Sequence, residues 1–170
     1  TEKEEVEVGG MADLASLVAR GKKQMEDGAF HLARIGLERA HAMAPDDRYV
    51  LDCLGYVCYF LSDYEASVRY NRKALALNPG NAYAMKGLGL SLSRLGQPGK
   101  AVSLITKAIE LSGDDISDYY MDLASVLSEH GKIKEAVKVL ARVRKHSARF
   151  REETEEYYRS LCKKAEGERT

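Results

Sequence analysis

Residues of the same type recur along this chain at a spacing of 34 residues. The period is visible at Gly21, Gly55 and Gly89, at Ala40, Ala74 and Ala108, and at Pro45 and Pro79. A period of about 20 to 50 residues is typical of a solenoid, in which each unit is too small to bury its apolar face alone and stacks on its neighbours. The period therefore predicts an array of short, similar units.

Each unit is predicted to contain two helices. In the second unit, Leu51, Leu54, Gly55 and Cys58 have the i, i+3, i+4, i+7 spacing of one helix face, and a second stripe follows from Tyr64 to Leu75. Ser62-Asp63 separates the two stripes. Pro79 prevents the second helix from continuing, and Asn81 is suited to cap the next one. The other units repeat this pattern, which predicts nine main helices, two per unit plus one near the C-terminus, and no strand.

The pattern also divides the chain into segments. Residues 1–13 carry one Lys and five acids, and we expect them to form a flexible acidic leader. Four repeats are expected over residues 14–150, with the boundaries 14–47, 48–81, 82–116 and 117–150. Residues 151–170 are expected to form a capping helix and tail, because Thr154, Tyr157, Tyr158 and Leu161 lie on one helix face. A solenoid needs such a cap to cover its last apolar surface.

Small residues recur at two positions where paired helices must approach closely. On the first helices these residues are Gly21, Gly55, Gly89 and Ala124. On the second helices they are Ala33, Ser67, Ala101 and Ala136. A larger side chain at either position is expected to push the pair apart.

Composition excludes several classes of protein. Lys+Arg and Asp+Glu both total 26, so no net charge draws the chain to nucleic acid or to a membrane surface. The basic run Lys138–Arg151 is interpreted as a solvated helix face, because four glutamates follow it closely. No apolar run is long enough to span a bilayer. The three cysteines lack disulfide-framework spacing, and Cys53 and Cys58 are expected in the core, which favours a reducing, cytoplasmic location.

The repeat resembles the tetratricopeptide repeat, whose signature includes a leucine-glycine pair, a downstream tyrosine, alanine and phenylalanine positions and a closing proline. The stretch from Asp63-Tyr64-Glu65-Ala66-Ser67 through Lys73-Ala74-Leu75 to Asn78-Pro79 is similar to that family's usual sequence. The family's aromatic residue at the start of each unit is replaced by Leu17, Leu51, Met85 and Tyr120. Arg20 and Gln24 occupy positions that are usually apolar, which suggests that the first helix lies at a solvated end.

The resemblance implies an all-α, right-handed solenoid of tandem helix-turn-helix repeats with a C-terminal capping helix. It also implies that the first helices line a concave groove that binds an extended peptide or a helix of a partner protein. On each first helix, the face next to the one that packs against the partner helix is expected to line the groove. The predicted groove residues are Lys22, Tyr49, Asp52, Tyr56, Tyr59, Tyr83, Lys86, Leu90 and Arg94. The tyrosines provide large contact areas with a polar tip, as at binding hot spots. Some of the rings could instead fill space between neighbouring helices.

Lys86 and Arg94 are expected beside the tyrosines, with Asp52 as the only nearby acid, which suits an apolar partner segment with an acidic group or a free C-terminus. Some members of the family grip the C-terminal carboxylate of heat-shock chaperones with lysines and asparagines. That clamp is incomplete here, because Asp52, Cys53 and Tyr56 occupy the middle unit where asparagine is expected.

The sequence predicts a protein-interaction adaptor rather than an enzyme. His31, His41, His130 and His146 are scattered without metal-ligand spacing, and no nucleophile has supporting context, so no catalytic residue, metal or cofactor is predicted. Two alternatives remain open: a structural scaffold that assembles from copies of itself, and a chaperone similar to those of bacterial type III translocators. Nucleic-acid binding through the basic run is the least favoured alternative.

Overall fold

The computed structural model describes residues 13–112, 117–144 and 153–167. Within these residues the chain forms helices and no strand, as predicted. The helices are α1 (Leu14–Glu26), α2 (Phe30–Met43), α3 (Arg48–Phe60), α4 (Tyr64–Leu77), α5 (Ala82–Arg94), α6 (Pro98–Ser112), α7 (Ser117–Glu129), α8 (Ile133–Arg144) and α9 (Glu153–Gly167).

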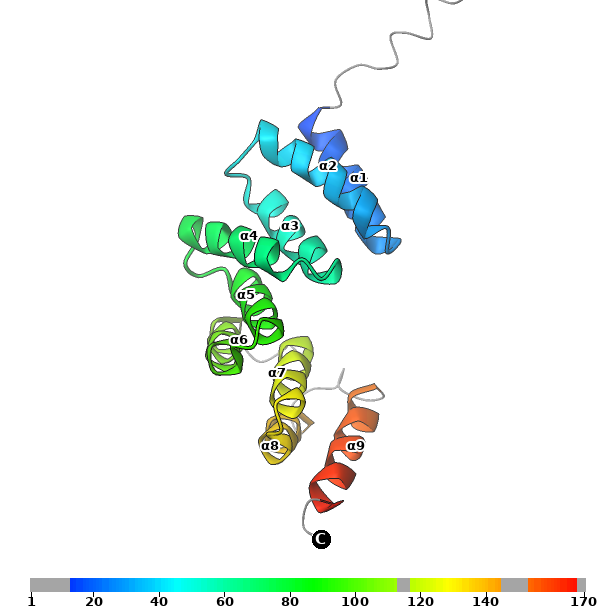
Figure 1. The fold of residues 1–170 in the computed structure, drawn as a ribbon, viewed down its shortest axis with the longest axis vertical. Coiled ribbons are helices and arrows are strands. Elements are labelled where there is room, and N and C mark those ends of the chain that lie inside the picture. The colour runs from blue at the N-terminus through cyan, green and yellow to red at the C-terminus, as the bar shows by residue number, and fades with distance from the viewer. Residues whose placement is uncertain (1–12, 113–116, 145–152, 168–170) are drawn as a thin grey trace, which may run out of the picture.

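The helices form a solenoid of stacked pairs. Each helix contacts the next one along the chain, and α1, α3, α5 and α7 also contact one another in that order. These four first helices therefore form a continuous row. Figure 1 shows the stack running from the α1–α2 pair at one end to α9 at the other. The predicted all-α solenoid is thus confirmed.

Side chains at the start of several helices explain why the helices begin where they do. The carboxylates of Asp13, Asp47 and Asp63 accept hydrogen bonds from the backbone N–H three residues later, at 2.7, 2.9 and 3.1 Å. Asn81 makes the same contact with Ala84 at 3.0 Å. Each bond satisfies an N–H that the first helical turn leaves unpaired. Asp13, assigned to the leader from the sequence, is therefore the cap of α1. Residues 1–12 lie outside the described part.

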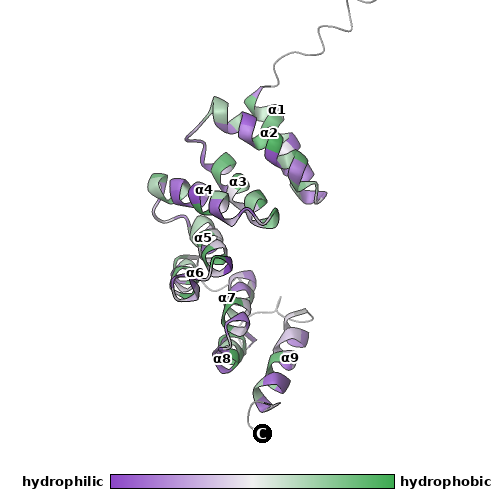
Figure 2. Ribbon diagram, in the orientation of Figure 1, coloured by the Kyte–Doolittle hydropathy of each residue, from purple (hydrophilic) through white to green (hydrophobic). Residues whose placement is uncertain are grey.

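Glycines allow the two helices of a pair to approach closely, as predicted. A Cβ atom at Gly21 would lie 2.9 Å from the Leu37 side chain, and one at Gly89 would lie 2.8 Å from Ile105. At Gly55 it would lie 2.7 Å from the Asn71 amide. On the second helices Ala33, Ser67, Ala101 and Ala136 are fully buried. Figure 2 shows hydrophilic and hydrophobic residues on different sides of the same helices, as expected when one face is packed.

The two ends of the stack differ in how they are packed. Only Leu17 and Gly21 are buried in α1, which agrees with its predicted place at a solvated end. At the other end, Leu161 of α9 is fully buried against the cluster that contains Leu140 and Val143 of α8. Arg144 and Glu155 join the same two helices through an ion pair of 2.8 Å. The second half of the basic run Lys138–Arg151, from residue 145 on, lies outside the described residues.

Candidate functional site

A cavity of about 140 Å³ opens on the row of first helices and is called the groove cavity below. It is lined by Gly55, Tyr56, Tyr59 and Phe60 of α3, Asn71 of α4, Tyr83, Lys86, Gly87 and Leu90 of α5, and Asp122 of α7. Five of the predicted groove residues are among them, namely Tyr56, Tyr59, Tyr83, Lys86 and Leu90. The remaining four predicted residues are not.

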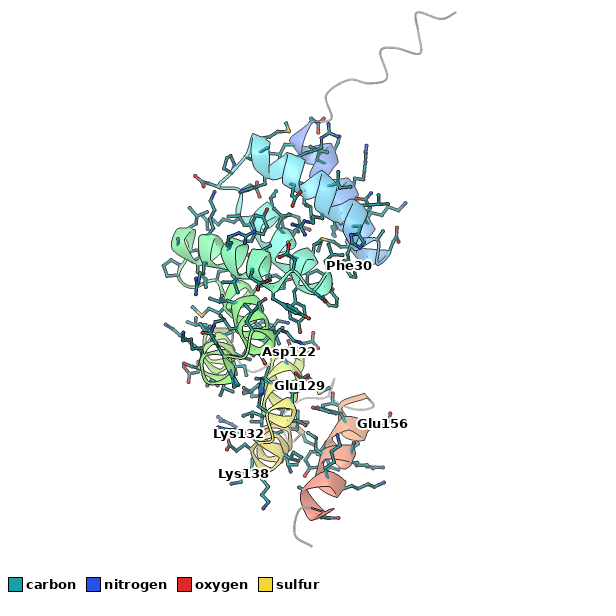
Figure 3. All side chains as sticks on the ribbon, in the orientation of Figure 1. Phe30, Asp122, Glu129, Lys132, Lys138 and Glu156 are labelled. Atoms are coloured by element: carbon teal, nitrogen blue, oxygen red, sulfur yellow. The ribbon has the colours of Figure 1, made fainter. Side chains whose placement is uncertain are left out.

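Aromatic rings form one wall of the groove cavity. The Phe60 ring contacts three other aromatic rings. Measured between ring centroids, it lies 4.5 Å from Tyr56, 5.6 Å from Tyr59 and 4.9 Å from Phe30. Phe30 comes from the start of α2, and Figure 3 shows it beside the end of α3. Phe60 nevertheless keeps 49% of its surface exposed and Tyr83 keeps 38%. The rings thus pack against each other and still present a contact surface.

The charged groups at the groove cavity neutralise each other. The Lys86 ammonium lies 2.9 Å from the Asp122 carboxylate and 4.6 Å from the ring centroid of Tyr119. Burial raises the pKa of Asp122, although the neighbouring Lys86 acts in the opposite direction. Figure 3 labels Asp122 on α7, the first helix that follows α5 in the row. Similarly, Arg94 pairs with Glu129 of α7 at 3.4 Å.

These ion pairs correct the sequence interpretation of the groove charge. Asp52 is not the only acid near the predicted cations, because Asp122 and Glu129 of the next repeat neutralise Lys86 and Arg94. The sequence argument for an acidic partner segment therefore fails. The groove residues are predicted from the face that each occupies on its own helix. That method cannot show these contacts, because they join residues of two different repeats.

The floor of the groove cavity is polar and buried. The Asn71 side chain, 1% exposed, donates from Nδ2 to the Ser67 carbonyl at 2.9 Å and to Ser67 Oγ at 3.2 Å. Ser67 Oγ donates in turn to the Gly55 carbonyl at 2.7 Å. The Ser91 hydroxyl lies 2.8 Å from Ser67 Oγ and 2.9 Å from the Gly87 carbonyl. These bonds connect α3, α4 and α5.

The other four predicted groove residues do not line the cavity. Lys22 is exposed and lies 4.0 Å from Glu26 of its own helix. Tyr49 is 47% exposed at the start of α3. The Asp52 carboxylate accepts a hydrogen bond of 2.9 Å from Asn81, and burial raises its pKa. Arg94 lies closest to the lining, because its Nε donates to the Tyr59 hydroxyl at 3.4 Å.

The predicted groove set lacks five residues of the lining, Gly55, Phe60, Asn71, Gly87 and Asp122, and also Phe30, which packs behind the lining against Phe60. Phe30 and Asp122 come from neighbouring repeats, and no local pattern marks them. Asn71 does carry a signal, because the period aligns it with Leu37, Ile105 and Leu140, three fully buried aliphatic residues. A polar residue in a series of core aliphatics is the kind of exception that indicates a functional site.

Comparison with known proteins agrees with this architecture. The sequence model of the family described as "Tetratricopeptide repeat" matches residues 82–115. TTC0263, a thermophilic TPR protein of Thermus thermophilus, superposes with a TM-score of 0.78 at 19% identity, over 94% of this chain and 86% of its own. Residues 82–115 thus match a tetratricopeptide repeat, and the chain as a whole has the fold of a tetratricopeptide repeat protein. The matched segment begins with α5 and includes all of α6.

Two further structures have the same fold. MamA matches with a TM-score of 0.69 at 22% identity, over 84% of this chain and 82% of its own. MamA from Desulfovibrio magneticus RS-1 matches with a TM-score of 0.70 at 20% identity, over 79% of this chain and 75% of its own. At these identities the likeness establishes the fold. No curated protein sequence matches the chain.

The tetratricopeptide repeat fold supports a general role as a protein-interaction scaffold. In the described part of the chain, no helix has the length and apolar character of a membrane crossing. Within that same part, no group of three or more His, Cys, Asp or Glu residues is placed to hold a metal ion.

Proposed function

We propose that this protein is an adaptor that holds a segment of a partner protein in the groove formed by α3, α5 and α7. The observation that carries the proposal is the groove cavity itself, a hollow with aromatic walls on the row of first helices. Large aromatic side chains in a concave site dominate the free energy of binding at many interfaces. Phe60 and Tyr83, which both keep a large exposed surface, are suited to this role.

The charge around the groove cavity favours an apolar contact. Lys86 is paired with Asp122 within the cavity, so it adds no unpaired charge there, and Arg94, whose pair with Glu129 is exposed, lies outside the lining. Breaking the half-buried Lys86–Asp122 pair to bind an acidic ligand would leave Asp122 without its partner, which is costly at a buried site. The partner segment is therefore expected to present an apolar or aromatic side chain to the cavity.

The test is affinity capture from the native host, followed by mass spectrometry and by affinity measurement with the captured protein. Tyr56→Ala and Tyr83→Ala are each expected to weaken binding by about 1–3 kcal/mol, the usual range of interface hot spots. Arg69→Ala and Arg72→Ala are matched controls, because both residues are exposed on α4 and neither lines the cavity. Thermal unfolding of each variant separates lost binding from lost folding.

The opposite result identifies a different binding surface. If affinity survives both tyrosine substitutions and falls in the arginine variants, the partner binds the second helices and the groove proposal is wrong. If the chain instead captures only copies of itself, and light scattering shows a mass that rises with concentration, it is a self-assembling scaffold.

A further inference from the structure

The most unusual group in the groove cavity is the Asn71 amide. It is the polar member of a four-repeat series that otherwise contains Leu37, Ile105 and Leu140, all fully buried. Replacing a core aliphatic residue with a buried amide is unfavourable unless the amide is fully hydrogen-bonded. A buried polar group that lacks a partner needs an explanation of its own.

The hydrogen bonds of Asn71 determine which way its amide faces. The Ser67 carbonyl can only accept, so the atom 2.9 Å from it must be Nδ2. The two hydrogens of Nδ2 are directed to the Ser67 carbonyl and to Ser67 Oγ. Oδ1 is therefore turned away from Ser67, and no donor from the described residues bonds to it. Because Oδ1 is not one of the fully buried unpaired atoms and Asn71 lines the cavity, this acceptor is left to bond to water or to a bound group.

Two glycines leave room for the amide. A Cβ atom would lie 2.7 Å from Oδ1 at Gly55 and 2.9 Å from Oδ1 at Gly87, and both glycines line the groove cavity. The period aligns Gly87 with Ala19, Cys53 and Asp122, so a side chain is usual at this position of the repeat. In this repeat the side chain that would crowd Oδ1 is missing.

The groove cavity therefore combines apolar walls with one free acceptor at its floor. Tyr56, Phe60, Tyr83 and Leu90 contribute apolar surface, and about 140 Å³ is available between them. An aliphatic side chain would fill the space and leave Oδ1 unpaired. A carboxylate has no hydrogen to donate, so its negatively charged oxygens would face the amide oxygen and be repelled by it. An aromatic ring with an N–H or O–H at its tip satisfies both parts of the site.

We infer that the partner inserts one tyrosine or tryptophan side chain into the groove cavity and that its O–H or N–H donates a hydrogen bond to Asn71 Oδ1. Asn71 is thus the residue that selects between side chains of similar size. This inference rests on the proposed function, because it requires a protein segment in the groove.

The test uses a phage-displayed library of random dodecapeptides selected on the whole 170-residue chain. Selected peptides are expected to share one Tyr or Trp. For a tyrosine-containing peptide, changing that Tyr to Phe is expected to weaken binding to the wild-type chain roughly 5- to 30-fold, the effect of a buried hydrogen bond. The same peptide change is expected to leave the affinity for the Asn71→Leu variant unchanged. Leucine is the residue found at this position in the first and fourth repeats.

Two further variants keep the test independent of folding. Ser91→Ala removes a hydroxyl from the same buried cluster without touching the cavity lining, so it is expected to retain the preference for Tyr over Phe. Gly87→Ala places a methyl group against Oδ1 and is expected to reduce that preference. If Asn71→Leu does not fold, Gly87→Ala takes its place.

The outcomes separate the two proposals. If no peptide is enriched, or if binding is insensitive to Tyr56→Ala and Tyr83→Ala, the groove proposal fails and this inference fails with it. If binding needs the two tyrosines but the peptides share no Tyr or Trp, the groove proposal stands and the role of Asn71 is refuted. An equal effect of the peptide Tyr-to-Phe change on wild type and Asn71→Leu also refutes the role of Asn71.

Discussion

Single residues at the turns show how the repeats differ in backbone strain. The residue that ends the turn between the two helices has a positive φ in all four repeats, at Gly28, Ser62, Gly96 and Gly131. The φ of Ser62 is 60°, in the left-handed region that costs a residue with a Cβ atom about 1–2 kcal/mol. Glycine avoids that cost, which explains its use in the other three repeats.

Replacing Ser62 with glycine is therefore expected to stabilise the protein. The gain should be about 0.5–1 kcal/mol, because relief of the left-handed strain is partly offset by the greater freedom of glycine in the unfolded chain. Urea unfolding followed by circular dichroism measures it. Gly96→Ser is the reverse control and should destabilise the chain by a similar amount. A lower stability of Ser62→Gly would show that the serine side chain contributes more than the strain costs.

The cysteines differ in chemical reactivity because they differ in burial. Burial raises the pKa of both Cys53 and Cys58 to about 11, and both side chains are buried in α3. Since the thiolate is the reactive form, both should be inert near pH 8, whereas the partly exposed Cys162 should react. Titration with a thiol reagent is expected to label one cysteine rapidly in the native chain and three in denaturant. Rapid labelling of all three under native conditions would contradict the packing of α3.

At the scale of elements, α9 covers the apolar surface that the last repeat leaves open. Leu161 is fully buried beside Leu140 and Val143, and Tyr157 and Tyr158 pack around the same cluster. Arg144 adds an ion pair to Glu155 and lies over the Tyr158 ring, with its guanidinium 5.2 Å from the centroid. The contact is therefore mainly apolar, with a polar margin.

Removal of residues 149–170 is expected to cause self-association. The truncation exposes Leu140 and Val143, and an exposed apolar patch of this kind drives aggregation. Light scattering and thermal unfolding measure the effect. Leu161→Ala is a milder variant that should cost about 2–5 kcal/mol, as for other large-to-small core substitutions. A truncated chain that remains monomeric and as stable as the parent would show that α9 is not a cap.

At the scale of the whole molecule, burial is uneven along the solenoid. In α3 and in α5 seven residues are buried, whereas in α1 only Leu17 and Gly21 are. In a solenoid each repeat is stabilised by its own packing and by its nearest neighbours. The first pair of helices should therefore open more readily than the central pairs.

Hydrogen exchange followed by mass spectrometry tests this expectation. Amides of α1 are expected to exchange faster than those of α3 and α5, because local opening of a poorly buried helix needs less free energy. The groove cavity, built on α3 and α5, should belong to the most protected part of the chain. Equal protection of α1 and α5 would mean that the solenoid unfolds as a single unit.

The fold could be predicted from the sequence because its determinants are local and periodic. The small residues at Gly55 and Gly89, the turn at Ser62 and the apolar stripes recur from unit to unit, and a proline closes the first two units at Pro45 and Pro79. The site could be predicted only in part. Tyr56, Tyr83 and Lys86 lie on the exposed side of first helices, so their place follows from helical geometry. Asp122 reaches the cavity from another repeat and Phe30 packs against its Phe60 wall from another, and no local spacing encodes those contacts.

The sequence by itself determined the helices, their pairing within each repeat and the row of first helices, because each depends on residues at most one repeat apart. Only the tertiary structure decided the chemistry of the groove. Stacking of adjacent repeats brings Asp122 within 2.9 Å of Lys86, which removes a free cation. The approach of Gly55 and Gly87 to Asn71 leaves an amide oxygen at the cavity floor. The ion pair and the approach of Gly87 depend on how closely adjacent repeats stack, and the approach of Gly55 depends on how α3 packs against α4; no local spacing in the sequence specifies these distances.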